Sequence, residues 1–234
     1  MKRFWTDVNI LPRGEGFGIA LDAREMKTPL KAALVVPTRA YAEGIAAEWD
    51  AVGAGEEINP LSMHLTRAAN ATIDSVIDKH EAVADMLAEY GNTDLICYRA
   101  DTPVELVERQ AKAWDPLLHW ADKLGAPLAP TTGVIFSPQP ENSLKTLRNM
   151  VHKYDAWRLT PLHDLVTISG SLIIGLAVAK GKLSATDAWP LSRIDEDWQS
   201  EQWGVDEEAA ATADLKRNEF LRAERLLSLL DQQS

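Results

Sequence analysis

The chain has one cysteine, Cys97, among its 234 residues. An intrachain disulfide is therefore excluded, and a reducing compartment fits this composition. Long apolar runs are also absent. The longest, Leu165–Ala179, has about 15 residues and is interrupted by small polar ones, whereas a membrane-spanning helix needs roughly 20. We interpret this run as a buried helix at the centre of a helical domain.

Basic side chains are few compared with acidic ones. The chain has 24 Lys and Arg against 35 Asp and Glu, which gives a formal net charge of −11. No basic stripe is visible, which argues against a nucleic-acid partner and against an anionic membrane surface. The first ten residues contain neither an apolar core nor an Arg- and Ser-rich leader, so no targeting peptide is expected.

The usual catalytic and cofactor motifs are missing as well. The five histidines form no HExxH motif, so no metal site is predicted. No Walker loop or dinucleotide fingerprint occurs, and no cofactor is expected. The glycines at positions 14, 16 and 18 lack the following helix that a phosphate loop requires, and they favour a hairpin. Ser169-Gly170-Ser171 is not a nucleophile elbow, and Cys97 is interpreted as a buried thiol.

The hydrophobic pattern changes its period near residue 37. Before this point apolar residues alternate, as at Phe17, Ile19 and Leu21, which predicts short antiparallel strands. After Thr38, which can cap a helix, the spacing is helical. The sequence therefore predicts an α+β fold. Residues 1–58 form a β-rich N-terminal domain with one helix at its end, and residues 59–234 form a larger all-helical domain.

Proline positions set the expected boundaries in the helical part. Three pairs have the pattern of a helix cap followed by a proline in the first turn: Asn59-Pro60, Thr102-Pro103 and Thr160-Pro161. The first predicts a helix to about residue 77. The second predicts one to Leu124 that Pro116 kinks or splits. The third opens the central helix to Lys180. Residues 126–140 predict a loop with a short strand at residues 134–136.

An acidic, tryptophan-rich segment follows the central helix. Residues 194–213 contain seven carboxylates and no Lys or Arg. On one helix over residues 189–203, Leu191, Ile194 and Trp198 form a core stripe. The opposite face, with the composition of a protein interface, carries Trp189, Glu196, Gln199, Ser200 and Trp203. Two interpretations stay open: this face binds a partner, or it packs under the last helix while the acids are solvated.

The acidic segment, residues 191–204 (LSRIDEDWQSEQWG), resembles the signature of a family of assembly chaperones. Their client is the alpha subunit in the soluble head of the F-type ATP synthase. Other short segments resemble this family in the same order along nearly the whole chain. They are residues 2–5 (KRFW), 18–22 (GIALD), 27–29 (KTP), 36–38 (VPT), 47–50 (AEWD), 63–66 (MHLT), 94–99 (DLICYR) and 114–116 (WDP). Mitochondrial relatives carry a leader that is absent here, so the resemblance suggests a bacterial, cytoplasmic member.

The resemblance implies a protein that is not an enzyme and needs no cofactor. Family members bind the free alpha subunit, shield its beta-facing surface and promote assembly of the head. In this family the acidic helix is important for function, and the resemblance places that importance on Asp195 and Glu196 in this chain. The partner-binding set expected here is Asp195, Glu196, Gln199, Trp203, Gly204 and Trp189. Trp49 is expected to be a structural anchor, as is Trp198 of the core stripe, and the protein is expected to be a monomer.

Two other hypotheses belong to different classes. A small-molecule hydrolase or lyase would use Asp195, Glu196 and a histidine such as His64 or His163 around a concave pocket. A structural oligomer would use the tryptophan face for self-association.

Overall fold

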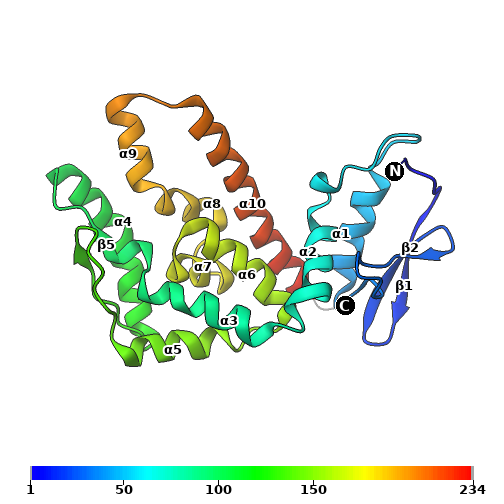
Figure 1. The fold of residues 1–234 in the computed structure, drawn as a ribbon, viewed down its shortest axis with the longest axis horizontal. Helices are drawn as coiled ribbons and strands as arrows, with labels where there is room; N and C mark the ends of the chain where they lie inside the picture. Colours follow the sequence, from blue (N-terminus) through cyan, green and yellow to red (C-terminus); the bar gives the residue numbers. More distant parts are fainter. Residues whose placement is uncertain (1, 233–234) are drawn as a thin grey trace. The chain divides into compact units, whose positions relative to one another are not determined.

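The computed structural model describes residues 2–232 and has an α+β fold, which confirms the predicted fold class (Figure 1). The chain divides into two units. The first, called the N-terminal unit here, contains Met1–His80, Ala156–Pro161 and Arg225–Ser234. The second, called the helical unit, contains Glu81–Asp155 and Leu162–Glu224. The expected boundary at residues 58 and 59 differs from this division, because helical segments distant in sequence complete the core of the N-terminal unit.

The N-terminal unit is built around an antiparallel sheet. Strands β1 (Val8–Arg13) and β2 (Gly16–Leu21) form a hairpin in which Val8 pairs with Leu21 and Arg13 with Gly16. On its other edge β2 pairs with β3 (Arg24–Glu25) and with β4 (Val35–Val36). The alternating pattern in residues 17–21 thus predicted β2 correctly.

Helices cover this sheet. Helix α1 (Arg39–Asp50) begins at Thr38, whose hydroxyl accepts a hydrogen bond from the Tyr41 amide. A short 3-10 turn η1 (Pro60–Ser62), α2 (His64–Ala71) and a π-helical turn η2 (Thr72–Val76) follow. Asn59 accepts a hydrogen bond from the Leu61 amide, so the predicted cap is present. The core combines sheet, helices and the end of the chain: Ile19, Leu34, Val36, Tyr41, Ala42, Ile45, Leu65, Ala69, Leu226 and Leu230.

Most remaining elements are helices. In order they are α3 (His80–Glu89), η3 (Tyr90–Asn92), η4 (Leu95–Cys97), α4 (Val104–Lys123), α5 (Glu141–Val151), α6 (Ala156–Ser169), α7 (Leu172–Ala179), α8 (Ala185–Ala188), η5 (Trp189–Ser192), α9 (Ile194–Trp203) and α10 (Glu207–Asp231). Among the described residues, no helix combines the length and apolar character that a membrane span requires.

The central apolar run is two helices, so the prediction of one helix from residue 160 to Lys180 is wrong. Helix α6 already begins at Ala156 and contains Pro161. Gly170 has φ +69°, which stops it, and Ser171 then caps α7 by accepting from the Ile174 amide. All seven residues from Leu172 to Val178 are buried. The interpretation of this run as a buried segment is therefore correct.

Two further details of the helical unit differ from expectation. Helix α4 starts after Pro103 and is unbroken through Pro116, so Thr102 is not its cap and the helix is not split. The strand expected at residues 134–136 is absent. A two-residue strand β6 (Thr131–Thr132) instead pairs in parallel with β5 (Tyr98–Arg99). Pairing with β5 selects these polar residues, although strand propensity favours the apolar ones.

Candidate functional site

The acidic segment is a 3-10 turn followed by a helix. Turn η5 ends at Ser192, whose hydroxyl donates to the Trp189 carbonyl at 2.8 Å. Arg193 has φ −120° and ψ 7°, and α9 starts at the next residue. The prediction of one continuous helix over residues 189–203 is therefore wrong. Because the turn shifts the angular register, residues before and after it do not share the faces expected from a single helix.

Trp189 is buried, and this corrects its placement on the exposed face. Its ring lies 5.9 Å from the ring of Phe220 in α10, and the Arg193 guanidinium lies 5.8 Å from its centroid. Trp189 therefore anchors α10 to the acidic segment within the helical unit. Trp198, expected as a second anchor, is half-buried in α9.

Three contacts hold the acidic segment on α4. The Gln110 side-chain amide donates to Asp195 Oδ1 at 2.6 Å. The Arg109 guanidinium pairs with both oxygens of Glu201 at 2.7 and 2.8 Å, and the Trp114 indole N–H donates to the Leu191 carbonyl. Arg109 lowers the pKa of Glu201 chiefly through this hydrogen bond. Asp195 therefore has a structural contact inside the protein, whatever else it binds.

We expect Gln110→Leu to loosen α9. Gln110 is buried, and its oxygen also accepts from the Ala100 amide at 2.8 Å. Leucine would leave that amide and Asp195 without their partner, at a cost of about 1–3 kcal/mol. Hydrogen exchange should become faster in α9, and urea unfolding should show the loss. The control is Lys112→Leu, at an exposed position of α4. Unchanged exchange in α9 would contradict this role.

The exposed part of α9 is smaller than the predicted face, because Trp189 is buried and Ser200 is half-buried. Glu196 and Gln199 are exposed, and the Glu196 carboxylate lies 3.3 Å from the Arg193 guanidinium. Trp203 is 81% exposed, which is unusual for so large an apolar side chain. Gly204 ends the helix with φ +94°, a conformation that other residues rarely adopt. Of the predicted set, Glu196, Gln199, Trp203 and Gly204 are accessible together on one short helix and its C-terminal cap.

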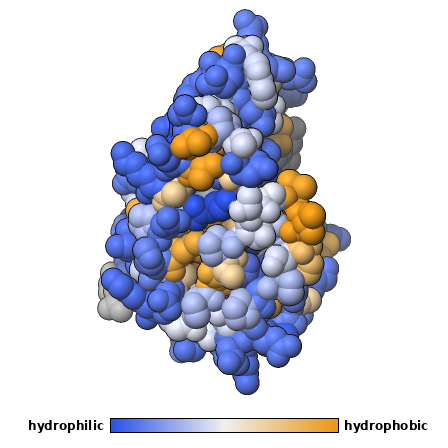
Figure 2. Space-filling view, turned by 90° about the vertical axis from the view of Figure 1, so that its left-hand side faces the viewer, coloured by the Kyte–Doolittle hydropathy of each residue, from blue (hydrophilic) through white to orange (hydrophobic). Residues whose placement is uncertain are grey.

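The structure also exposes apolar side chains in the loop where the sequence predicted a short strand. Val134, Ile135 and Phe136 are 94%, 82% and 55% exposed in the loop between β6 and α5. Val205, which follows α9, and Leu215 in α10 are exposed too. Figure 2 shows the side that carries α4, β5 and α9, where apolar side chains form separate patches between hydrophilic ones. The sequence signal for the loop was the proline-rich stretch around it, which disfavours a strand.

Catalytic and metal-binding arrangements have little support in the described residues. Asp195 and Glu196 contact Gln110 and Arg193, and His163 contacts the neighbouring Asp164 at 3.1 Å. Between residues 2 and 232, no group of three His, Cys, Asp or Glu side chains could hold a metal ion. Cys97 is buried, and burial raises the pKa of its thiol to about 12, which makes it a poor nucleophile.

Trp49, the other expected anchor, lies in the N-terminal unit. Its indole N–H donates to the Thr66 hydroxyl at 3.0 Å, and its ring lies 5.2 Å from that of Trp5. The ring is half-buried and joins α1 to α2. This position agrees with a structural role within that unit.

A helical unit with an exposed aromatic and acidic helix, and without a catalytic cluster in the described residues, has the features of a protein-binding module. Comparison with known proteins gives the family. Residues 2–122 match the family described as ATP12 chaperone protein, and the chain belongs to this family.

Relatives extend the likeness over nearly the whole chain. The crystal structure of Atp12 from Paracoccus denitrificans is 48% identical, covers 97% of both chains and superposes with a TM-score of 0.94. The Atu1473 protein of Agrobacterium tumefaciens is 39% identical, with a TM-score of 0.92, over 98% of this chain and 86% of its own. The mitochondrial protein atp12 of Schizosaccharomyces pombe is 27% identical, over 89% of this chain and 75% of its own length. The expected class, an ATP synthase assembly chaperone, is thereby confirmed.

Proposed function

We propose that this chain is a chaperone that binds the free alpha subunit of the F-type ATP synthase, shields its beta-facing surface and promotes assembly of the soluble head. The observation that carries this proposal is the likeness to Paracoccus Atp12 over 97% of the chain. The proposed setting is the bacterial cytoplasm, where the protein acts as a monomer without a cofactor and without catalysis.

The surface of α9 supports a role in client binding. A free subunit exposes an apolar interface that aggregates unless another protein covers it. A protein that covers it needs aromatic anchors for affinity and charges for orientation and association rate. Trp203 offers the anchor and Glu196 the charge, on a helix that Gln110 and Arg109 hold in place. We therefore propose Glu196, Gln199, Trp203 and Gly204 as client contacts, with Asp195 supporting them.

Co-purification tests the client. The full chain should retain the alpha subunit of its own organism and should not retain the beta subunit. Retention of neither subunit by the folded chain would contradict the proposed function.

The α9 contacts are tested by measuring dissociation constants for the alpha subunit. Glu196→Lys and Trp203→Ala should each raise the constant at least tenfold, which corresponds to about 1.4 kcal/mol or more. Glu219→Lys and Leu215→Ala are the controls, because at exposed positions of α10 they make the same charge reversal and a comparable truncation of a large apolar side chain. If the variants and their controls bind equally well, α9 is not the client surface, although the client itself stays as proposed.

A further inference from the structure

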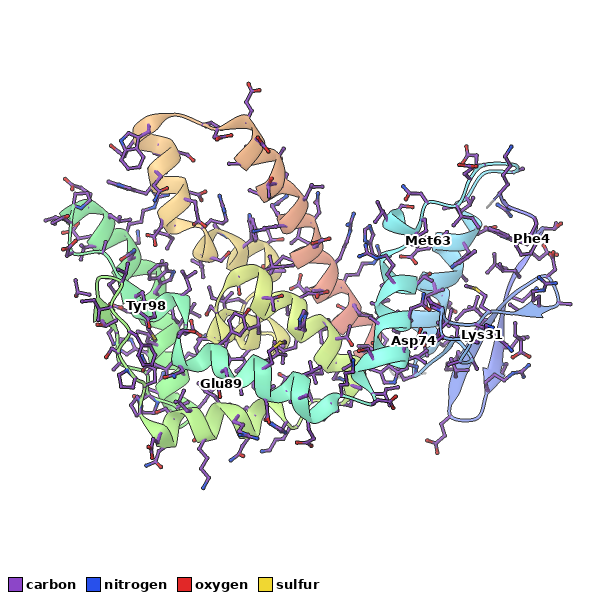
Figure 3. All side chains as sticks on the ribbon, in the orientation of Figure 1. Phe4, Lys31, Met63, Asp74, Glu89 and Tyr98 are labelled. Atoms are coloured by element: carbon purple, nitrogen blue, oxygen red, sulfur yellow. The ribbon has the colours of Figure 1, made fainter. Side chains whose placement is uncertain are left out.

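The N-terminal unit contains an apolar groove of about 840 Å³. Its apolar walls include Phe4, Leu21, Met26, Trp49, Ile58 and Met63. Figure 3 labels two of them: Phe4 in the N-terminal segment and Met63 at the start of α2. Phe4 is 54% exposed, and Leu30 and Leu61, whose neighbours Pro29 and Pro60 line the groove, are more than two-thirds exposed. The groove is therefore an accessible apolar surface.

One wall of the groove is the edge of a strand-like segment. All six residues from Arg24 to Pro29 line it. Side chains of consecutive residues in an extended segment point to opposite faces, so a groove that all six line must run along the edge. At ~3.3 Å per residue, this wall is about 17 Å long. Such a length fits an extended peptide of about six residues better than a compact small molecule.

The backbone of this edge is available for pairing. The Met26 amide donates to the Ile19 carbonyl at 2.8 Å, and the Leu34 amide donates to the Met26 carbonyl at 3.1 Å. Both groups of Met26 therefore face the sheet. Backbone groups alternate between the two edges of a strand, so those of Glu25 and Lys27 face outward. Outward-facing backbone groups of this kind can form hydrogen bonds with an added strand from a partner protein.

The charges around the groove indicate the charge of its binding partner. Arg24, Lys27 and Arg67 line it, and within residues 2–232 none of the three has a carboxylate at ion-pair distance. Glu25, the one acid in the lining, is already paired with Arg13. This is a local cationic surface on a chain of net charge −11. Two such edges would repel each other, which disfavours a second copy of this chain and favours an acidic partner.

We propose that this groove binds an extended segment of the client that alternates apolar and other residues and carries at least one acidic side chain. The segment pairs with the outward backbone groups of Glu25 and Lys27. Its apolar side chains lie in the groove, and its carboxylate faces Arg67. The identity of the client rests on the proposed function, whereas the chemistry of the segment rests on the groove.

Hydrogen exchange and charge reversal test the groove in the full chain. With the alpha subunit bound, amide exchange in residues 24–29 should slow at least tenfold. Arg67→Glu should raise the dissociation constant at least tenfold. Arg67 is exposed, and within residues 2–232 its side chain makes no hydrogen bond or ion pair, so the variant should fold. Lys79→Glu is the matched control, an exposed residue of the same unit outside the groove lining.

A positional-scanning library of nine-residue peptides tests the groove without the alpha subunit. The chain should enrich apolar residues at alternate positions together with Asp or Glu, and Arg67→Glu should lose the acidic preference. If the alpha subunit binds, but exchange in residues 24–29 does not slow and Arg67→Glu does not weaken binding, the inference is overturned and the proposed function stands. If the alpha subunit does not bind, the proposed function falls and the library decides: enrichment supports the groove, and its absence overturns it.

Discussion

Replacing Asp94 by alanine should cost about 3–5 kcal/mol of unfolding free energy at pH 4, the largest effect expected in the helical unit. Asp94 is fully buried, and its carboxylate accepts hydrogen bonds from the Ile96 amide at 3.3 Å and the Ile173 amide at 3.0 Å. Alanine leaves both amides buried without a partner, and each such donor costs about 1–3 kcal/mol.

The same residue should make stability depend on pH in a direction unusual for an acid. Burial raises the pKa of Asp94 from 3.8 to about 6, and the hydrogen bonds from Ser171 and the neighbouring amides offset this in part. The raised pKa means that the folded state holds the proton more tightly than the unfolded state does. The stability contribution is therefore complete below about pH 4 and is lost as the pH rises through 6, with a total fall of about 3 kcal/mol by pH 7.

Urea unfolding from pH 4 to pH 7 measures this effect when wild type is compared with Asp94→Asn. The asparagine does not titrate, so its stability should lack the fall between pH 4 and pH 7. Other carboxylates titrate in both proteins and cancel in the difference. An identical pH dependence of the two proteins would show that Asp94 has an ordinary pKa in the folded state.

Replacing Trp49 by alanine should cost about 3 kcal/mol, at the lower end of the range for tryptophan because the ring is half-buried. The loss combines packing against Trp5 with the hydrogen bond to Thr66. The Thr66 hydroxyl in turn donates to Glu48, which accepts from the amides of Leu65 and Thr66 at 2.6 and 2.9 Å. The last turn of α1 thus caps α2, and Trp49 supports this contact.

Two further variants serve as comparisons for Trp49→Ala: one separates packing from hydrogen bonding, and one removes an exposed tryptophan. Trp49→Phe retains an aromatic ring and loses the indole N–H, so we expect a cost of about 1 kcal/mol. Trp203→Ala, at an exposed tryptophan, should change unfolding by less than about 0.5 kcal/mol. Urea unfolding of the three variants gives the comparison. If Trp49→Ala is as stable as Trp203→Ala, Trp49 is not a structural anchor.

Local signals predicted most elements of the fold. The turn at residues 13–16 and the alternating residues after it specify the hairpin of β1 and β2, because both depend on neighbours in sequence. Thr38 and Asn59 were recognised as caps for the same reason, and each accepts the expected amide. The break at Gly170 was missed. A glycine in an apolar run is compatible with a helix until tertiary packing favours its positive φ.

The candidate site was predicted less well than the fold. The sequence singled out the acidic helix, but it placed Trp189 beside Trp203 on the assumption of one continuous helix. The turn at Ser192 and Arg193 separates them, and the two tryptophans have opposite environments. The apolar groove of the N-terminal unit was not predicted at all, because its residues come from four separate segments between residues 4 and 70.

The sequence by itself determined the α+β class, the absence of disulfides, the acidic balance and the family to which the chain belongs. These properties depend on composition, on spacing within a few residues, or on motif order along the chain. Only the tertiary structure decided that Asp195 is held by Gln110, that Trp189 is buried while Trp203 is exposed, and that the outer edge of residues 24–29 borders a groove. The physical reason is that burial and hydrogen-bond partners depend on residues far away in sequence, which no local pattern encodes.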